Sequence, residues 1–195
     1  MASRWRARGP RPPALARGLC AFAAGLAVLA AAAASAGGEG EASRGAWHRQ
    51  LGWPPSLCPL ASPRPGSAAV DLRPIDERRS WVVVVCQDTA GSATQLVYLR
   101  TADRTRLLVF PQYDASRAGA PRPYRSSLLE GSLSFGADAG VIHVLRPYRG
   151  IGDCGQRLSY QAGAAPPRLM ALRVRECPPT LDRPVPPEQW PLRRP

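Results

Sequence analysis

The chain has 195 residues and a formal net charge of +12, because 26 arginines oppose 14 acidic residues. It contains no lysine, which excludes Schiff-base chemistry, Ser–Lys dyads and the P-loop. The arginines are spread along the chain without a dense block or interleaved aromatics, so they do not predict a nucleic-acid interface. A basic surface of this kind is instead expected to attract an anionic partner.

The first 36 residues have the pattern of a secretory signal peptide. Residues 1–18 carry five arginines and no acid, residues 19–34 are apolar and rich in alanine, and Ala34-Ser35-Ala36 ends the run. A basic start, an apolar middle and a small-x-small exit are typical of export signals, so cleavage is predicted near Ala36. A retained N-terminal anchor is the alternative, since the apolar run approaches the length of a short membrane span. The expected location is the periplasm or the exterior, with no stable membrane span after signal removal.

Residues 37–74 are predicted to form a flexible, Pro-rich N-terminal strap. Residues 37–50 are small and polar, as suits a loose start of the mature chain. Six prolines between Gly52 and Pro74 rule out a regular helix there. This stretch is therefore expected to be extended and irregular around Cys58.

A β domain is predicted over residues 75–177. The run WVVVVC at 81–86 is typical of a strand that is buried on both faces. Segments 94–101 and 106–113 follow it across short polar connections, and all three are expected to be consecutive antiparallel strands. Residues 114–126 are rich in Pro, Gly and Arg and are predicted to interrupt the pattern. Further short strands are expected at 132–135, 140–146, 156–161 and 168–177.

The last predicted strand alternates, so Leu169 is expected on the face opposite to Met170 and Leu172. The tail that follows, residues 178–195, is rich in proline and is predicted to be extended, with Trp190 as its anchor to the domain.

Several short strands without a convincing amphipathic helix indicate a mainly β fold. The expected architecture is an antiparallel sheet folded as a small sandwich or partly open barrel and stapled by disulfides.

Four cysteines follow the predicted cleavage site: Cys58, Cys86, Cys154 and Cys177. An even number in an exported chain favours two disulfides, with three alternative connectivities. Cys154 and Cys177 bracket a predicted hairpin, so a bridge between them would close its base and stabilise the fold by about 3 kcal/mol. The remaining pair, Cys58 with Cys86, would then tie the N-terminal strap to the first strand.

Cys154 lies in the sequence GIGDCG, residues 150–155, which we call the GIGDCG turn. Its three glycines are Gly150, Gly152 and Gly155. Glycines allow a sharp turn and the close approach of another segment. Asp153 is expected to accept hydrogen bonds from backbone N–H groups within the turn. The segment is therefore interpreted as the turn that brings Cys154 to Cys177.

Cys154 has two alternative interpretations. A catalytic thiolate needs a base and an oxyanion site, and the two histidines of the chain are His48 in the strap and His143 within a predicted strand. A zinc ligand needs closely spaced Cys and His, but the chain has no C-x-x-C and no H-x-x-x-H. No metal site and no cofactor are therefore predicted.

His143 is the basis of the competing class, an envelope hydrolase. There it would act with Asp153 and a serine such as Ser159, although no nucleophile elbow surrounds a serine. It would then lie in a cleft with an acid and a hydroxyl within hydrogen-bond reach. A third class, an inhibitor or ligand-binding module for an anionic partner, predicts an exposed groove lined by aromatic or arginine side chains.

Three stretches combine a strand ending in Cys, the GIGDCG turn, a strand pair, a second Cys and a terminal Trp-Pro. They are residues 80–99, 146–163 and 172–195. This order resembles the C-terminal part of a bacterial exported family catalogued as domain of unknown function 1176. The resemblance covers about residues 75–195, and its most specific element is the GIGDCG turn. It implies an envelope location and paired cysteines, and it assigns no activity.

These features predict a non-enzymatic protein of the bacterial periplasm or envelope, acting by binding or as a structural accessory. No convincing catalytic constellation in the sequence supports an enzyme. The expected partner is an anionic envelope component or a protein, and not a nucleic acid.

Overall fold

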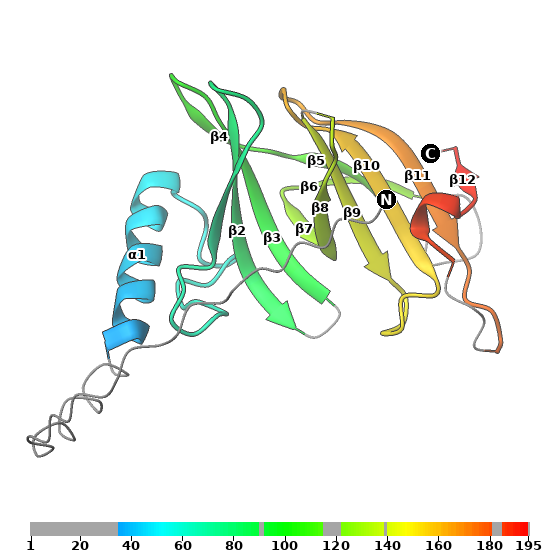
Figure 1. Ribbon diagram of the computed structural model, residues 1–195, viewed down its shortest axis with the longest axis horizontal. Helices are drawn as coiled ribbons and strands as arrows, with labels where there is room; N and C mark the ends of the chain where they lie inside the picture. Colours follow the sequence, from blue (N-terminus) through cyan, green and yellow to red (C-terminus); the bar gives the residue numbers. More distant parts are fainter. Residues whose placement is uncertain (1–34, 90–91, 115–121, 139, 181–184, 195) are drawn as a thin grey trace, which may run out of the picture. The chain divides into compact units, whose positions relative to one another are not determined.

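The computed structural model describes residues 35–89, 92–114, 122–138, 140–180 and 185–194 (Figure 1). The helices in these ranges are α1 (Ser35–Leu51) and the short 3-10 helix η1 (Pro187–Gln189). The strands are β1 (Val70–Pro74), β2 (Ser80–Thr89), β3 (Ser92–Arg100), β4 (Thr105–Leu107), β5 (Phe110–Asp114), β6 (Arg122–Ser126), β7 (Leu128–Glu130), β8 (Ser132–Phe135), β9 (Val141–Pro147), β10 (Gly155–Gln161), β11 (Arg168–Arg175) and β12 (Leu192–Arg193). The paired strands are antiparallel, which confirms the predicted mainly β fold.

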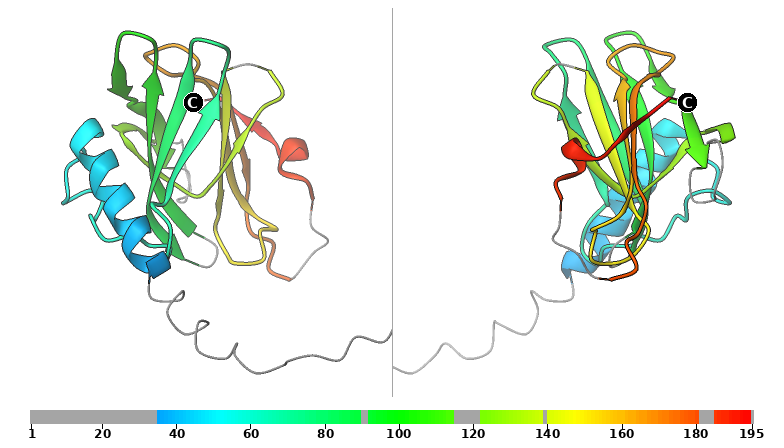
Figure 2. Two further views of the ribbon diagram at one scale, coloured as in Figure 1. Left: turned by 60° about the vertical axis from the view of Figure 1, so that its left-hand side comes forward. Right: turned by 90° about the vertical axis from the view of Figure 1, so that its right-hand side faces the viewer.

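Two five-stranded sheets pack as a sandwich. The first sheet has the order β1-β2-β3-β4, with β7 also paired to β3, and the second sheet has the order β12-β11-β10-β9-β8. Strands β5 and β6 form a separate two-stranded sheet. Figure 2 shows the first and second sheets facing one another. They do not close into a barrel.

The main core fills the space between the two sheets. The first sheet contributes Trp81 and Val83 from β2, together with Val97 and Leu99 from β3. The second sheet contributes Ile142, Val144, Leu158, Tyr160, Leu172 and Val174. Alternate residues of a strand point to one face, so each sheet buries its inner row of side chains. Each fully buried aliphatic or aromatic side chain stabilises the fold by roughly 1.5–3 kcal/mol.

A second core, the outer core, covers the opposite face of the first sheet. There Val82, Val84 and Cys86 of β2 pack against Trp53 and Cys58 of the N-terminal strap. Strand β2 is thus buried on both faces, as its unbroken apolar run predicts. In Figure 1 helix α1 lies beside the first sheet, on the side away from the second.

The prediction of a flexible segment at residues 37–50 is wrong, because these residues belong to α1. Trp47 and Leu51 pack against the outer core, and His48 donates from Nε2 to the carbonyl oxygen of Trp53 at 3.0 Å. Packing of this kind, more than helix propensity, stabilises helices in proteins. None of the helices in the described ranges is long and apolar enough to cross a membrane.

Arg44 fastens α1 to the rest of the N-terminal strap. Its side chain is fully buried, and the guanidinium donates to the carbonyl oxygens of Pro59, Leu60 and Ala68 at 2.9 to 3.1 Å. The same group lies 5.3 Å from the centroid of the Trp53 ring. Because a buried charge needs polar partners, these carbonyl oxygens and the ring face are what make its burial tolerable.

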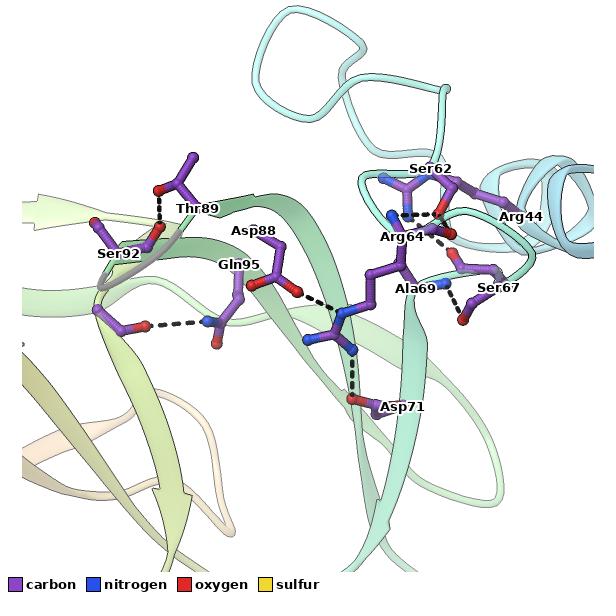
Figure 3. Close-up of polar contacts among 12 residues, drawn as sticks. Arg44, Ser62, Arg64, Ser67, Ala69, Asp71, Asp88, Thr89, Ser92 and Gln95 are labelled. Atoms are coloured by element: carbon purple, nitrogen blue, oxygen red, sulfur yellow. Dashed lines mark hydrogen bonds and ion pairs between the residues drawn. The ribbon is translucent and has the colours of Figure 1, made fainter. Parts of the chain in front are cut away.

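Arg64 ties the irregular part of the strap to the first sheet (Figure 3). Its Nε donates to Asp88 of β2 at 2.6 Å, and its Nη1 lies 3.8 Å from the carboxylate of Asp71 on β1. The Oγ of Ser62 accepts from the Arg64 backbone N–H at 3.2 Å and shapes the same loop. The three charged side chains are partly exposed, so these pairs orient the loop and contribute little to stability.

The predicted strand at 106–113 is in fact two strands that lie in different sheets. Strand β4 ends at Leu107, and β5 begins at Phe110. Leu108 and Phe110 are buried while Val109 between them is 40% exposed, so the alternation of a strand continues through the crossing. The pattern therefore gave no sign of the change of sheet. Strands β1, β6 and β7 were also not predicted.

Strand β11 contains a bulge at Met170 that reverses part of the predicted alternation. Ser159 pairs with Ala171, but Tyr160 pairs with Leu169, which leaves Met170 unopposed. Leu169 packs against the main core and Met170 is 54% exposed. Leu169 and Met170 thus lie on opposite faces as predicted, but their predicted faces relative to Leu172 are wrong, because one extra residue in a strand shifts the alternation beyond it.

The C-terminal tail adds the short strand β12 to the edge of the second sheet, where Leu192 pairs with Arg173 of β11. Trp190 is buried, as predicted for the anchor of the tail. Its indole Nε1 donates to the carbonyl oxygen of Val185 at 2.9 Å, and its own carbonyl oxygen accepts from Arg173 at 2.8 Å. The tail is therefore attached through backbone groups as well as through the buried ring.

Candidate functional site

Four cysteines form two disulfides, in the pairing that their spacing predicts. Cys154 is bonded to Cys177 and Cys58 to Cys86, with Cα–Cα distances of 4.9 and 4.7 Å. We call these the C-terminal and the N-terminal disulfide. Cys177 is exposed, whereas the other three cysteines are buried. Within the described ranges no group of three His, Cys, Asp or Glu side chains is placed to hold a metal ion.

The GIGDCG turn uses two of its three glycines for backbone geometry. Gly152 has a φ of +69° and Gly155 a φ of +147°, conformations that residues with side chains rarely adopt. A Cβ on Gly155 would also overlap the backbone of Arg146 on β9. Position 150 has open space around it, so its surroundings do not require glycine there. The sharp turn and the close approach predicted for this segment are therefore located at Gly152 and Gly155.

Asp153 is fully buried, and its main partner is Arg149, which the sequence reasoning did not identify. Arg149 donates from Nε to the Asp153 carboxylate at 2.8 Å and again from Nη2. This hydrogen bonding, together with the guanidinium charge, holds the pKa of Asp153 below its ordinary value. The predicted role as an acceptor of backbone N–H groups is secondary to this pair. Arg149 also donates to the carbonyl oxygen of Pro178 at 3.2 Å, so one side chain connects both halves of the C-terminal disulfide.

His143 is half-buried in β9, on the face of the second sheet that points away from the main core. Its Nδ1 lies 2.8 Å from the Oγ of Ser159, its direct partner on β10. Burial and the charge of Arg157 lower the pKa of His143, and the carboxylate of Glu188 opposes them. The imidazole is therefore neutral at neutral pH and hydrogen-bonded to a hydroxyl.

The hydrolase prediction requires Asp153 beside this pair, and the structure does not place it there. Asp153 is bonded to Arg149 in the turn before β10. Ser159 lies four residues beyond Gly155, which is about 13 Å along a strand. Strand β10 is paired on both sides at Ser159, and the bulge at Met170 lies opposite Ser159 and Tyr160 on β11.

A pocket of about 220 Å³ lies where the chain crosses from β4 to β5, against the loop that precedes β11. Two exposed arginines line it, Arg106 of β4 and Arg125 of β6. The other lining residues are Leu107, Leu108, Val109, Ala165, Pro166 and Pro167. In the part of the chain that the structure describes, neither guanidinium is paired with an acidic side chain. Two unopposed guanidinium groups beside apolar walls suit an anionic group attached to an apolar one.

Neither arginine was predicted as a site residue. An arginine-lined groove is expected of a ligand-binding module, but no residue of the sequence was assigned to it. Arg125 lies in β6, where four consecutive residues are exposed and no alternation indicates a strand. Arg106 could be placed from the sequence, because it begins the third of the three consecutive predicted strands. No pattern in the sequence indicated that Arg125 lies across the pocket from it.

The fold and the site define a disulfide-stapled antiparallel β-sandwich with an arginine-lined pocket at one edge. The chain matches no protein-family model, no curated protein and no solved structure. Its function is therefore argued from the pocket, the disulfides and the His143–Ser159 pair.

Proposed function

We propose that this protein is an exported, non-enzymatic protein of the bacterial envelope that binds an anionic partner. The observation that carries the proposal is the pocket with Arg106 and Arg125, because two guanidinium groups with no acidic partner among the described residues are suited to hold a carboxylate or a phosphate. Cleavage after Ala36 removes five arginines and no acid from a chain of net charge +12, and the remaining charge of +7 would assist the approach of such a partner.

Export is supported by the two disulfides, since such bonds persist mainly in oxidising compartments. The signal-like pattern of residues 1–36 supports it as well, although residues 1–34 lie outside the described part of the chain. The first packed side chain of α1 with described contacts is Arg44, eight residues beyond Ala36, so cleavage there would leave the outer core intact. Membership of the exported family that the GIGDCG turn resembles remains part of the proposal.

Cell fractionation and intact mass measurement test the export step. We expect the protein in the periplasm, beginning at Gly37 and lacking free thiols among its four cysteines. A membrane-bound form that keeps residues 1–36 would identify the retained anchor. Cytoplasmic protein with its N-terminus intact and its cysteines reduced would overturn the proposal of export.

Crosslinking in intact cells tests the binding step. Arg106→Gln with Arg125→Gln removes both charges from the pocket, and Arg104→Gln is the matched control, because Arg104 is also exposed but does not line the pocket. Partners crosslinked to the wild-type protein should be lost in the double variant and retained in the control. An unchanged set of crosslinked partners in the double variant would contradict a binding role for the pocket.

The hydrogen bond between His143 and Ser159 favours a second candidate, the envelope hydrolase. It would use Ser159 as the nucleophile and His143 as the base. A fluorophosphonate probe distinguishes the candidates, because it labels activated serines. Our proposal expects no labelling that Ser159→Ala removes, because Asp153, the acid predicted to orient His143, is bonded to Arg149 in the turn before β10. Labelling that depends on both Ser159 and His143 would establish the hydrolase instead.

A further inference from the structure

Strand β4 leaves one edge of the first sheet open beside the pocket. Leu108 N–H donates to the carbonyl oxygen of Val97, and Thr101 N–H donates to that of Arg104. Because hydrogen-bonded pairs alternate in an antiparallel ladder, the backbone groups of Arg106 point to β3. By the same alternation, the N–H and C=O groups of Thr105 and Leu107 point away from β3.

Nothing in the described ranges pairs with that outer edge of β4, since β4 ends the order of the first sheet. An open edge with outward N–H and C=O groups accepts an additional extended chain. Leu107 belongs both to this edge and to the lining of the pocket. The edge therefore leads directly into the pocket.

The pocket is small and open to solvent. Its volume of about 220 Å³ is below the range of roughly 300–1,000 Å³ for sites that hold drug-sized molecules. It exceeds the roughly 150 Å³ of a cavity that holds a single benzene ring. One apolar side chain, with an anionic group attached close to it, fits this space.

We propose, on the basis of the proposed binding function, that the pocket binds the C-terminal residue of an extended peptide or protein. The terminal carboxylate pairs with Arg106 and Arg125, and the last side chain, which is apolar, lies against Leu107, Val109 and the prolines. The preceding residues add to the edge of β4 through the free groups of Thr105 and Leu107. Capture of a carboxylate and addition of a strand are thus combined at one site.

Charge and hydrogen bonding together select this ligand class. The two guanidinium groups require an anion, and the apolar walls require an apolar group attached to it. A free small acid satisfies both requirements, but it makes no use of the backbone groups along β4. A peptide with a free C-terminus uses all three features, so the test separates it from a small acid.

Fluorescence anisotropy with a rhodamine-labelled pentapeptide, Gly-Ser-Thr-Val-Phe, measures this binding directly on the purified, oxidised protein. Three probes are compared: the peptide with a free carboxylate, the same peptide as its C-terminal amide, and N-acetyl-phenylalanine as an unlabelled competitor. We expect the amide to bind about tenfold more weakly than the free acid, because it loses charge-assisted hydrogen bonds. N-acetyl-phenylalanine should compete only weakly, because it lacks the residues that pair with β4.

Single variants assign the contacts. Arg106→Gln and Arg125→Gln should each lower the affinity for the free-acid peptide by about tenfold. The weak affinity for the amide should stay nearly unchanged. Arg104→Gln is the control for charge and should change the affinity less than about twofold. Thr105→Pro removes one outward N–H from an edge strand that tolerates proline, and it should weaken the peptide but not N-acetyl-phenylalanine. Circular dichroism confirms that each variant is folded.

Equal binding of the acid and the amide, or an equal loss with Arg104→Gln, would overturn the assignment. If N-acetyl-phenylalanine competes as well as the unlabelled peptide and Thr105→Pro has no effect, the ligand of the pocket is a small acid and not a peptide. These failures are distinct from a failure of the proposed function. If the peptide does not bind but the crosslinked partners still depend on Arg106 and Arg125, the binding function stands and only the ligand class falls.

Discussion

The two disulfides close loops of similar length but hold very different surroundings together. Their sequence separations are 28 and 23 residues, and the chain-entropy model gives about 3.5 kcal/mol for each. The N-terminal disulfide lies inside the outer core, next to Trp53 and close to the buried Arg44. The C-terminal disulfide lies at the end of the second sheet, where the Arg149–Asp153 pair and the exposed Cys177 surround it.

This difference shows that loop length alone does not set the structural role of a bridge. The N-terminal disulfide secures the layer that packs on Val82 and Val84 on the outer face of the first sheet, so apolar packing depends on it. The C-terminal disulfide secures a turn and the start of the tail, and what depends on it is a charge pair. Chemical perturbations should therefore affect the two regions to different degrees and under different conditions.

Removal of each disulfide should destabilise the protein more than any other change, and to a different extent in the two regions. Cys58→Ala with Cys86→Ala should lower the free energy of unfolding by about 4–5 kcal/mol, because the outer core loses packing as well as its crosslink. Cys154→Ala with Cys177→Ala should lower it by about 3 kcal/mol. Urea titration followed by tryptophan fluorescence measures both. Equal losses would show that the outer core does not depend on its bridge.

Replacement of Arg44 tests the N-terminal region without touching a cysteine. Arg44→Met keeps the volume of the stem but leaves three carbonyl oxygens without their donor, so the free energy of unfolding should fall by about 3 kcal/mol. Arg49→Met, at an exposed position of the same helix, should change it by less than about 0.5 kcal/mol. The same urea titration applies. Similar effects of the two substitutions would contradict a specific role for Arg44.

Acid should weaken the C-terminal region through the Arg149–Asp153 pair. Arg149 lowers the pKa of Asp153, so this carboxylate contributes stability above the ordinary Asp pKa of about 3.9, and the contribution is lost as the pH falls through the lowered value. Asp153→Asn should reduce the slope of unfolding free energy against pH in this acidic range. Asp138→Asn, an exposed control, should retain the wild-type slope. An unchanged slope in Asp153→Asn would mean that the pair does not couple to folding.

The smallest expected effect lies in the tail, beyond the C-terminal disulfide. Glu188 forms an ion pair of 3.0 Å with Arg157 but is 61% exposed, so Glu188→Gln should cost less than about 1 kcal/mol. The same substitution removes the carboxylate that raises the pKa of His143, and that pKa should fall further. NMR titration of the His143 ring protons measures the change. A rise in the pKa would contradict the described arrangement of these charges.

The cysteine pairing and the sandwich were predictable from the sequence because their signals are local. Cys154 and Cys177 flank one hairpin, and the run at 81–86 is apolar on both faces of its strand. Helix α1 was missed because its residues are small and polar, and its stability comes from contacts with distant parts of the chain. Local patterns do not report such contacts.

The candidate site was predictable only in part, for the same reason. Asp153 and its glycines were found from the GIGDCG turn, but its partner Arg149 was not distinguished from the many other arginines. The pocket joins Arg106, Arg125 and the loop at 165–167, which come together only through the packing of the sheets. Composition suggested an anionic partner, and only the fold brings together the residues of the proposed binding site.

The unequal exposure of the cysteines has a consequence for oxidative folding. Disulfide exchange proceeds when a thiolate reaches one sulfur of the bridge, and access decides which sulfur is attacked. Among the four cysteines that the structure describes, Cys177 is exposed, while Cys154 and both partners of the other bridge are buried. An oxidoreductase would therefore form its mixed disulfide with Cys177. Repair or opening of the folded molecule thus begins at its C-terminal end, with the outer core still closed.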